Sequence, residues 1–589
     1  MSLFTWTTNP LTFQELATSA AFDTLFNELA GWIGQTPSNV DMSQLGEYNA
    51  GFYGYNSTAS MTQFTSALNA VAAAAQQAGL SSNTSGGGGR IRIPYVNLGF
   101  GANGPNAVQV NGIINLVPPA VVTAGGYSNS DISAATNSQT IQQTVNSDLF
   151  YFNCGSGSGG NLGGQYIHDL RLSFADGLSG NIAALHCVGG QEWFIERVLA
   201  KEAPVGFMFD NTLHSNAFEC DAIYSHAANV NNAVGFMVGN PTASGDRSNQ
   251  VRLNRCQVGF TTNNGTGSAT GVLIQAVIHC VVDDMYVFGA PVAYSLLPSA
   301  INGNSIEQVT MQNCQAGGFT QYGFLIQPAS STGSGGKDIH IIGGRTQQSV
   351  GGGLAGTVGV FVGVNGQTAN AMQDVKLLSH SIENCGLYGL QLDGGQNLQV
   401  IGGTFGSNGT AGLALTGSSP ANYAGAITIT DVDLQPEFEG GSPQTYGIYV
   451  PTGVTINVPI LVKGCTLTGY GNWWQAISVL GTLTNFKVED CPGYTDVTAA
   501  VATGASVTSG TAFNGTTIGS HPYFGKTRLQ FTYTGTITGL TVSIANNQGM
   551  LGSTALTATN FYNYELEANE WLELTWTGGG TITVSGVGH

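Results

Sequence analysis

Apolar and polar positions alternate in short stretches that recur along the middle of the chain. One such stretch is "GFMFDN" at residues 206–211, and nearly the same letters return as "GFMVGN" at 235–240. Strict alternation over four residues predicts a β-strand with one buried face, and a recurrence every ~30 residues is typical of one turn of a solenoid. The pattern of glycine, apolar, any residue and apolar begins at eight glycines, which are Gly206, Gly235, Gly271, Gly323, Gly359, Gly389, Gly412 and Gly447.

A second pattern runs out of phase with the first. It consists of apolar, any residue, apolar, two further residues and then a small or apolar residue, as in "VRLNRC" at 251–256 and "FKVEDC" at 486–491. In nine of twelve copies the residue before the last position is Asn, Asp or Gly, which adopt the left-handed backbone conformation at little cost. We therefore expect a sharp corner followed by an inward-pointing residue at twelve positions: Leu170, Val198, Ile223, Cys256, Met285, Cys314, Gly344, Cys385, Gly403, Val432, Cys465 and Cys491.

Together the two patterns predict an all-β fold, a parallel β-helix of about twelve coils over residues 166–495. Each coil of such a solenoid buries its strands only against its neighbours. With a spacing of about 4.8 Å between strands, twelve coils make a rod of about 58 Å. Function is then expected on outward-facing strand residues and on loops, because these are the parts that solvent and ligands reach.

The segments on either side differ from the coils. Residues 1–45 contain an amphipathic stretch, which predicts a helix that either caps the β-helix or docks it to a larger assembly. Residues 46–165 are expected to form the first part of the β-helix, before the regular coils. Residues 496–520 have the composition of a linker, and 521–589 alternate like the strands of a small β domain.

Composition and charge limit the function. There are 85 glycines, 42% of residues are hydrophobic and only 8% are charged, which favours β structure with many turns over disorder. The net charge of −19 repels phosphate backbones and anionic lipids, so we expect neither nucleic-acid binding nor membrane insertion. The first Lys or Arg is Arg90, so the charged start of a secretory signal is missing and folding in a cytoplasm is expected. The nine cysteines include no Cys-x-x-Cys pair, so no metal site or other cofactor is expected.

Two segments resemble a known family. "LGEYNAGFYGYNSTASMTQFTSALNAVAAAAQQAG" followed by "GGGGRIRIP" is similar to the start of pectate-lyase-like β-helices in phage tailspikes, and "VEDCPGYT" at 488–495 resembles their Asn-Pro-Gly-Tyr-Asn ending. The acidic Gly-Asp-Gly motif of that family is absent. The resemblance covers residues 46–495 and implies a right-handed parallel β-helix. It further implies a homotrimer, a C-terminal module that caps or trimerises the rod, and a bacterial surface polysaccharide as ligand. A place on the virion tail is implied as well, with residues 1–45 as the segment that would dock to the phage tail or baseplate.

Glycoside hydrolysis uses two carboxyl groups about 5 to 9.5 Å apart, so we searched for acid pairs. Asp284, Asp431 and Asp490 occupy corners, where the backbone already explains them. Asp210 and Asp393 face outward on the "GFMFDN" strands, but about six coils, or 29 Å, separate them.

One loop pair remains as a candidate sugar site. The loop 432–447 carries three acids as candidate catalytic residues, and the matching loop one coil later, 465–476, carries three aromatic residues for substrate binding. Rings can stack on sugar faces while carboxyl groups transfer protons. The alternative is that the tryptophans pack against a partner or the C-terminal domain while the acids are merely solvated. The predicted residues are Asp433, Glu437, Glu439, Tyr470, Trp473 and Trp474.

The sequence thus predicts a tailspike-like receptor-binding protein that recognises a surface polysaccharide, with cleavage by a depolymerase of the glycoside hydrolase type left open. A non-catalytic adhesin or structural spike is one alternative, and a free polysaccharide lyase or hydrolase is another, although the shortage of Lys and Arg counts against a lyase. A homotrimer is also expected, because an apolar column on the outer face of the "GFMFDN" strands needs a cover, either from identical chains or from a loop of the same chain. The column consists of Met208, Met237, Leu273, Leu325 and Phe361.

Overall fold

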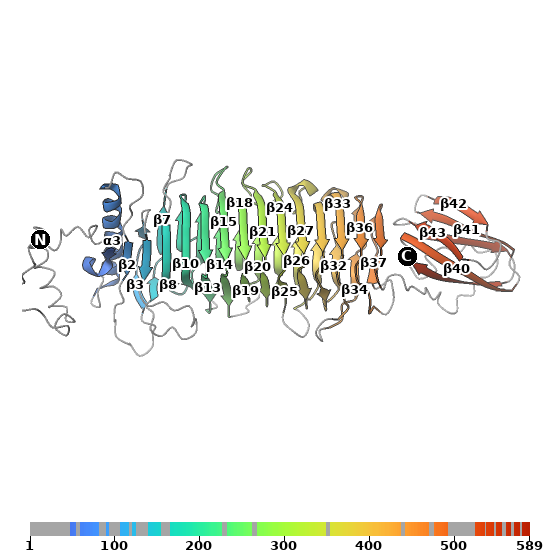
Figure 1. The fold of residues 1–589 in the computed structure, drawn as a ribbon, viewed down its shortest axis with the longest axis horizontal. Helices are drawn as coiled ribbons and strands as arrows, with labels where there is room; N and C mark the ends of the chain where they lie inside the picture. The colour runs from blue at the N-terminus through green and yellow to red at the C-terminus, as the bar shows by residue number, and fades with distance from the viewer. Residues whose placement is uncertain are drawn as a thin grey trace, which may run out of the picture.

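The computed structural model shows a long rod of stacked strands with a helix at its N-terminal end and a second group of strands beyond its last coil (Figure 1). The structure describes residues 47–54, 59–81, 90–93, 107–116, 121–124, 140–154, 165–226, 232–261, 268–348, 354–437, 442–470, 476–492, 525–535, 538–546, 549–555, 561–566, 571–577 and 580–588. The expected N-terminal segment 1–45 and the expected linker 496–520 lie outside the described residues.

Most coils contribute a long strand, a short strand and a strand of a second sheet. The long strands from β8 onward confirm twelve coils, and they form one outer surface, the long-strand face. They are β8 (Gln165–Phe174), β10 (Gln191–Lys201), β12 (Leu213–Phe218), β15 (Ser248–Asn254), β18 (Val277–Asp283), β21 (Ile306–Gln312), β24 (Gly336–Ile342), β27 (Met372–Leu378), β30 (Gly395–Ile401), β33 (Tyr423–Thr430), β36 (Ile460–Lys463) and β39 (Phe486–Glu489).

The short strands follow after a corner and form the short-strand face. Because β8 and β10 run through the corner, long and short strands count as one 24-stranded parallel sheet. The short strands are β13 (Asp221–Tyr224), β16 (Gln257–Phe260), β19 (Tyr286–Phe288), β22 (Gln315–Gly317), β25 (Arg345–Gln347), β28 (Ser381–Glu383) and β31 (Phe405–Gly406).

The "GFMFDN" repeats form the third surface, a 13-stranded parallel sheet that we name sheet 2. Its strands are β4 (Ile114–Leu116), β7 (Phe150–Asn153), β9 (Ala183–Val188), β11 (Val205–Asp210), β14 (Val234–Val238), β17 (Thr270–Ile274), β20 (Val292–Leu296), β23 (Tyr322–Ile326), β26 (Val358–Val362), β29 (Tyr388–Leu392), β32 (Ala411–Leu415), β34 (Tyr446–Val450) and β37 (Ile477–Val479). The β-helix is right-handed, the hand that parallel crossover connections nearly always take.

Parallel coils begin before residue 166. In the segment expected as the first part of the β-helix, β5 and β6 pair with β8, and β7 pairs with β9, so this segment continues the same rod. The remaining strands here are β1 (Glu47–Asn49), β2 (Arg90–Ile93), β3 (Ala107–Val110), β5 (Val121–Ala124) and β6 (Thr140–Gln143), and a short pair, β35 (Thr455–Ile456) and β38 (Thr482–Leu483), lies near the other end.

Helix α3 (Met61–Ser81) packs on the first coils. Its start is capped reciprocally: the Ser60 amide donates to Gln63 Oε1 at 2.8 Å, and the Gln63 amide donates to Ser60 Oγ at 3.4 Å. Asn69 then exchanges hydrogen bonds with the backbone of Ile113 and Asn115 on the first strands. The helix therefore covers apolar residues at the N-terminal end of the core.

Three short 3₁₀ turns also occur along the rod. They are η3 (Ala50–Tyr53), η4 (Ala369–Ala371) and η5 (Pro420–Asn422).

The C-terminal strands form two antiparallel three-stranded sheets, in the orders β43-β40-β45 and β42-β41-β44. This confirms the small β domain. Its strands are β40 (Gly525–Gly535), β41 (Thr538–Asn546), β42 (Gly549–Ala555), β43 (Phe561–Leu566), β44 (Trp571–Thr577) and β45 (Gly580–Gly588). None of the helices in the described part of the chain has the length and hydrophobicity of a membrane span.

In eight strands of sheet 2 the second residue is glycine, and close packing explains this choice. A Cβ atom on Gly271 would lie 2.3 Å from Val287 Cγ1 and 2.5 Å from the carbonyl oxygen of Ala293 in the next coil. Gly206 and Gly235 face the same kind of contact with the following coil. Sheet 2 and the short strands converge at this edge, so there is little room for a side chain, and the position is taken by glycine or, as at Ala184 and Ala293, by alanine; this explains why the chain repeats nearly the same letters.

The predicted corners are confirmed at ten of twelve positions, where the residue before the inward position has a positive φ and also aligns in register with the corners of the neighbouring coils. Two are wrong. The corner residue of one coil is Glu219, with Cys220 inward, instead of Ala222 and Ile223; the corner of another is Ser379, with His380 inward, instead of Asn384 and Cys385. The confirmed corners are Asp169, Arg197, Arg255, Asp284, Asn313, Gly343, Gly402, Asp431, Gly464 and Asp490.

All nine cysteines are free and buried, as small hydrophobes in the core should be. Four of the five cysteines predicted in the inward column occupy it, and Cys385 does not, because His380 takes its place. His380 is fully buried, with Nδ1 near the carbonyl oxygen of Gly343 and Nε2 2.7 Å from Thr346 Oγ1. Burial lowers the pKa of His380 to about 4, so it is neutral in the core.

The apolar column on the outer face of sheet 2 is covered in part by the single chain. Met208 is fully buried and Met237 is 3% exposed, in a small cluster with Ala183, Val205 and Val234. Asn240, which follows β14, places its side-chain nitrogen 3.7 Å from the Met208 sulfur. The premise that the whole column lies bare is therefore wrong for these two methionines, whereas Leu273, Leu325 and Phe361 are half-buried.

Candidate functional site

The structure places the predicted loop pair side by side, as solenoid stacking requires: a Cβ on Gly469 would lie 3.0 Å from the Pro436 ring. Asp433 lies on the short-strand face between Thr404 and Thr466, and its Oδ2 accepts a hydrogen bond from Gln435. Glu437 is exposed. Three further predicted residues, Glu439, Trp473 and Trp474, lie outside the described residues.

Tyr470 does not present its ring for stacking. It packs against the core, and its hydroxyl oxygen accepts a 2.6 Å hydrogen bond from Nε2 of the buried Gln444. Burial raises the pKa of Tyr470 well above the usual range of tyrosine. Tyr470 thus anchors the loop, and the acids there stand beside a structural tyrosine instead of a sugar-stacking one.

An aromatic surface that the sequence patterns did not single out lies on sheet 2, on β34, which directly follows the first loop of this pair, and on β29, two coils earlier. Tyr446 and Tyr449 of β34 stack with ring centroids 4.8 Å apart and planes only 7° from parallel. Tyr388 of β29 lies 6.5 Å from Tyr449. We name these three residues the tyrosine floor. The strand between them contributes Ala411 and Ala414, which leave room for the rings to meet across two coil spacings.

A chain of polar groups borders the tyrosine floor. Gln391 Nε2 donates to Thr416 Oγ1 at 2.9 Å, and Thr416 Oγ1 donates to Asp393 Oδ1 at 3.1 Å. Burial raises the pKa of Asp393, although the Thr416 hydrogen bond opposes the rise. Asp393 is therefore a half-buried carboxyl group that holds its proton more firmly than an ordinary aspartate, a property suited to a general acid.

The aromatic surface continues past Asp393 towards the N-terminal coils. Gly363, in register beside Asp393, has room for no side chain, because the Phe361 ring lies 2.5 Å from the position of its missing Cβ. Phe361 in turn meets Tyr322 edge to face at 5.6 Å. Aromatic rings, a carboxyl group, an amide and a hydroxyl thus share one outer surface from β23 to β34.

The N-terminal half of sheet 2 carries a different cluster. His186 lies between two carboxylates, with Nδ1 2.8 Å from Asp148 Oδ2 and Nε2 2.9 Å from Asp210 Oδ2. The two carboxylates raise the pKa of His186 to about 9 despite its burial, so it is an imidazolium at neutral pH. We name this arrangement the histidine clamp. All three side chains are largely buried, and the clamp joins three successive coils.

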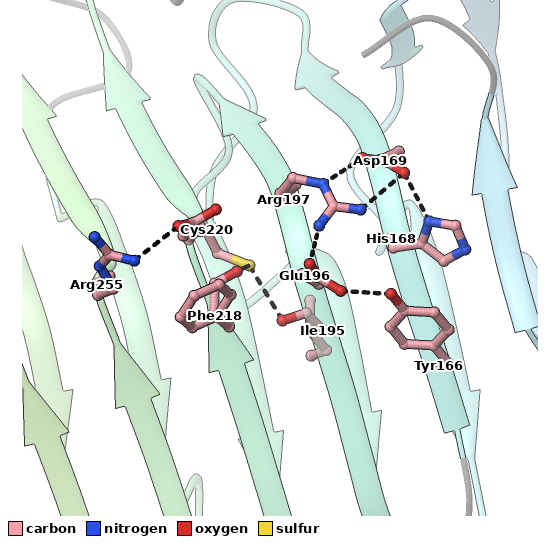
Figure 2. Close-up of polar contacts among 10 residues, drawn as sticks. Tyr166, His168, Asp169, Ile195, Glu196, Arg197, Phe218, Cys220 and Arg255 are labelled. Atoms are coloured by element: carbon pink, nitrogen blue, oxygen red, sulfur yellow. Dashed lines mark hydrogen bonds and ion pairs between the residues drawn. The ribbon is translucent and has the colours of Figure 1, made fainter. Parts of the chain in front are cut away.

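The corners of the first coils carry a ladder of alternating charges, the corner ladder: Asp169, Arg197, Glu219, Arg255 and Asp284. Figure 2 shows Arg197 held by Asp169 of the preceding coil at 2.7 and 3.1 Å and by its own neighbour Glu196. Arg255 continues the ladder with Glu219 at 3.3 Å and Asp284 at 3.8 Å. The ion pairs offset part of the cost of a left-handed backbone at arginine, which explains why arginine occupies two of the corners.

His168 and Tyr166 complete the polar group of Figure 2. Their rings stack at 4.4 Å, His168 Nδ1 lies 2.7 Å from Asp169 Oδ2, and the Tyr166 hydroxyl contacts Glu196. Every charge in this group faces an opposite charge within it, so it is a structural network. No group of His, Cys, Asp and Glu side chains in the described ranges is arranged to hold a metal ion.

The chain is therefore a parallel β-helix protein with an aromatic site on one outer sheet. No protein-family model matches the sequence, and no curated protein matches it. Among solved structures it is similar to the tailspike protein of E. coli bacteriophage HK620 in complex with a pentasaccharide, at 12% identity over 93% of this chain and 94% of that chain, with a TM-score of 0.45.

Two other solved structures illustrate the range of proteins with this architecture. The A-module of the mannuronan C-5 epimerase AlgE4 of Azotobacter vinelandii is 13% identical over 76% of this chain and 96% of that chain, with a TM-score of 0.42. PfbA, a surface adhesin of Streptococcus pneumoniae, is 11% identical over 89% and 98%, with a TM-score of 0.35. Phage tailspikes are thus among the proteins that share the fold, as the sequence resemblance predicted.

Proposed function

We propose that the outer face of sheet 2 from β26 to β34 binds a bacterial surface polysaccharide, and that the chain is a tailspike-like receptor-binding protein of a phage tail. The observation that carries the proposal is the tyrosine floor with its polar border of Gln391, Thr416 and Asp393. The solved structures named above share only the fold with this chain, so the proposal depends on this surface.

The chemistry of the surface suits a sugar. Tyrosine rings offer apolar faces to the C–H face of a pyranose and keep a hydroxyl for hydrogen bonding. The amide, hydroxyl and carboxyl groups beside them can pair with sugar hydroxyls. The net charge of −19 disfavours phosphate-rich ligands such as nucleic acids.

The binding test uses Tyr449 and Tyr388, the two tyrosines that contact each other across the coils. Tyr449→Ala and Tyr388→Ala should each weaken polysaccharide binding about tenfold, because each removes one stacking face. Calorimetry against a panel of purified O-antigen and capsular polysaccharides measures this. Phe194→Ala, an exposed aromatic on the long-strand face, is the matched control and should bind like the unmodified protein. Unchanged affinity in both tyrosine variants would contradict the proposal.

For cleavage we propose Asp393 as the acid, with Glu437 or Glu439 as its partner, because the loop that carries these two glutamates leads directly into β34. Asp393→Asn should then abolish the release of new reducing ends while polysaccharide binding persists, and Glu437→Gln or Glu439→Gln should lower it at least 100-fold. Asp433 also belongs to this loop, and the release of reducing ends by Asp433→Asn is measured for comparison with the two glutamate variants.

If no variant changes turnover, or if the unmodified protein releases no reducing ends, the chain is a non-catalytic adhesin. That is the second candidate function, and it is favoured by the single carboxyl group at the tyrosine floor. A free lyase or hydrolase would cleave the polysaccharide without any tail attachment.

A homotrimer is also part of this proposal. The half-buried Leu273 and Leu325, on strands before the proposed binding surface, leave an apolar strip that identical chains could cover, and the C-terminal β domain is a candidate trimerisation module. Light scattering of the intact chain tests this: a monodisperse monomer would refute it.

A further inference from the structure

The short-strand face carries a second aromatic feature, which lies on a single coil and is remote from the tyrosine floor along the chain. Tyr286 and Phe288 of β19 both point away from the core, with exposed fractions of 38% and 40%. Their ring centroids are 6.2 Å apart, and their planes are tilted by 32°. We name this pair the β19 platform.

Glycines on both sides determine the shape around the platform. Phe288 is in register with Gly259 in the coil before and with Gly317 in the coil after. On the far side the ring lies against the chain, since a Cβ on Gly317 or Gly318 would be 3.2 or 3.0 Å from Phe288 atoms. On the near side a Cβ on Gly259 would touch nothing within 4 Å. The platform therefore has one closed side and one open side.

The polar groups beside the rings are neutral. Gln257 and Gln315 flank Tyr286 in register, one in each adjacent coil. Neither side-chain amide has a hydrogen bond to another described residue, so both keep donors and acceptors for a ligand. Along this row the nearest cation is Arg345, two coils from Tyr286, and its guanidinium is bound to the buried carboxylate of Glu383.

These features favour one kind of occupant. Two side chains cover only a small part of the about 800 Å² that each partner contributes to a stable protein interface. A nucleic-acid base could stack on the rings, but the net charge of −19 repels its phosphates. Among the described residues an anionic sugar would meet only paired cations, because Arg255, at the corner before Gln257, contacts Glu219 and Asp284, and Arg345 is bound to Glu383. A neutral pyranose matches the pair of ring faces, the open shelf over Gly259 and the two flanking amides.

We propose that the β19 platform is a second carbohydrate subsite, which stacks a neutral pyranose unit of the same polysaccharide that the tyrosine floor binds. It rests on the proposed function for the identity of the ligand. Two subsites on one chain hold a long polysaccharide more firmly than either does alone, because the second contact forms at a high effective concentration.

The test compares the two sites by stoichiometry. Fragments of two or three repeat units, prepared from the O-antigen and capsular polysaccharides of the panel, are titrated into the intact protein by calorimetry. The unmodified protein should bind two fragments per chain. The double variant with Tyr286→Ala and Phe288→Ala should bind one, as should Tyr449→Ala, and the long polysaccharide should lose at least tenfold in affinity in either case.

Gly259→Leu provides a second variant, because it fills the open shelf without removing a ring and should also reduce the stoichiometry to one. Thermal unfolding checks that the variants fold. One fragment per unmodified chain, lost in Tyr449→Ala and unaffected by the platform variants, would overturn the second subsite and leave the proposed function intact. No binding of any panel member to the unmodified protein would overturn both.

Discussion

Replacing Gly271 by alanine is expected to lower the free energy of unfolding by about 3 kcal/mol. The new Cβ would lie 2.3 Å from Val287 Cγ1 and 2.5 Å from the carbonyl oxygen of Ala293. The valine side chain could rotate away, but the carbonyl belongs to the strand of the next coil and is held by the hydrogen bonds of sheet 2. The clash can therefore be relieved only by moving the two coils apart.

Gly259→Ala is the matched control, because it adds the same methyl group to a neighbouring strand where nothing lies within 4 Å. It should leave stability unchanged or raise it slightly, since alanine restricts the unfolded chain more than glycine does. Guanidinium unfolding followed by circular dichroism compares the two variants. Equal midpoints for both would mean that the repeated glycine is not a packing requirement.

Raising the pH from 6 to 10 should remove about 3 kcal/mol of stability that the histidine clamp contributes. The pKa of His186 rises from 6.5 to about 9 on folding, and each pKa unit corresponds to about 1.4 kcal/mol. A raised pKa means that the folded state binds the proton more tightly. The stabilisation is therefore fully present below pH 6.5 and disappears as the pH rises through 9.

His186→Gln isolates this contribution from the other groups that titrate in the same range. The variant should be less stable than the unmodified protein at pH 6, because Asp148 and Asp210 lose the cation between them, and the difference should shrink as the pH approaches 10. Unfolding midpoints at pH 6, 8 and 10 measure the difference. A difference that stays constant with pH would show that His186 is neutral in the folded protein.

The corners show what a sequence pattern can and cannot predict. Asp284 and Asn313 were found because their residue types favour the left-handed conformation that the corner needs. Glu219 and Ser379 lack that preference, so their residue types did not mark them as corners; the prediction fell instead on Asn384, which has the preference, and on Ala222, which does not. Cys385 was wrongly predicted in the inward column because it is small and buried and follows Asn384, which has a positive φ. The true inward residue, His380, lies five positions earlier.

The candidate site was harder to predict than the fold. Asp393 was correctly placed on the outer face of sheet 2, but the search required a second carboxylate, and Asp210 is far away. Tyr388 and Tyr446 were not identified as candidate site residues because they precede the glycine with which each strand pattern starts. The repeated letters "YG" in "YGLQL" and "YGIYV" were a signal that could have found them. The contact between Tyr388 and Tyr449 also depends on the small Ala414 in the coil between them, and the sequence of one strand alone does not show this.

The corner ladder has a consequence for how the chain finds its structure. Strands such as "GFMFDN" and "GFMVGN" are so alike that a growing rod could accept the wrong one, with a whole turn left out. Omitting the turn that carries Glu219 would set Arg197 against Arg255, and omitting the turn that carries Arg197 would set Asp169 against Glu219. Like charges in contact repel, so only the complete order of coils places opposite charges side by side along the ladder. The alternation of sign therefore disfavours a rod with a missing coil.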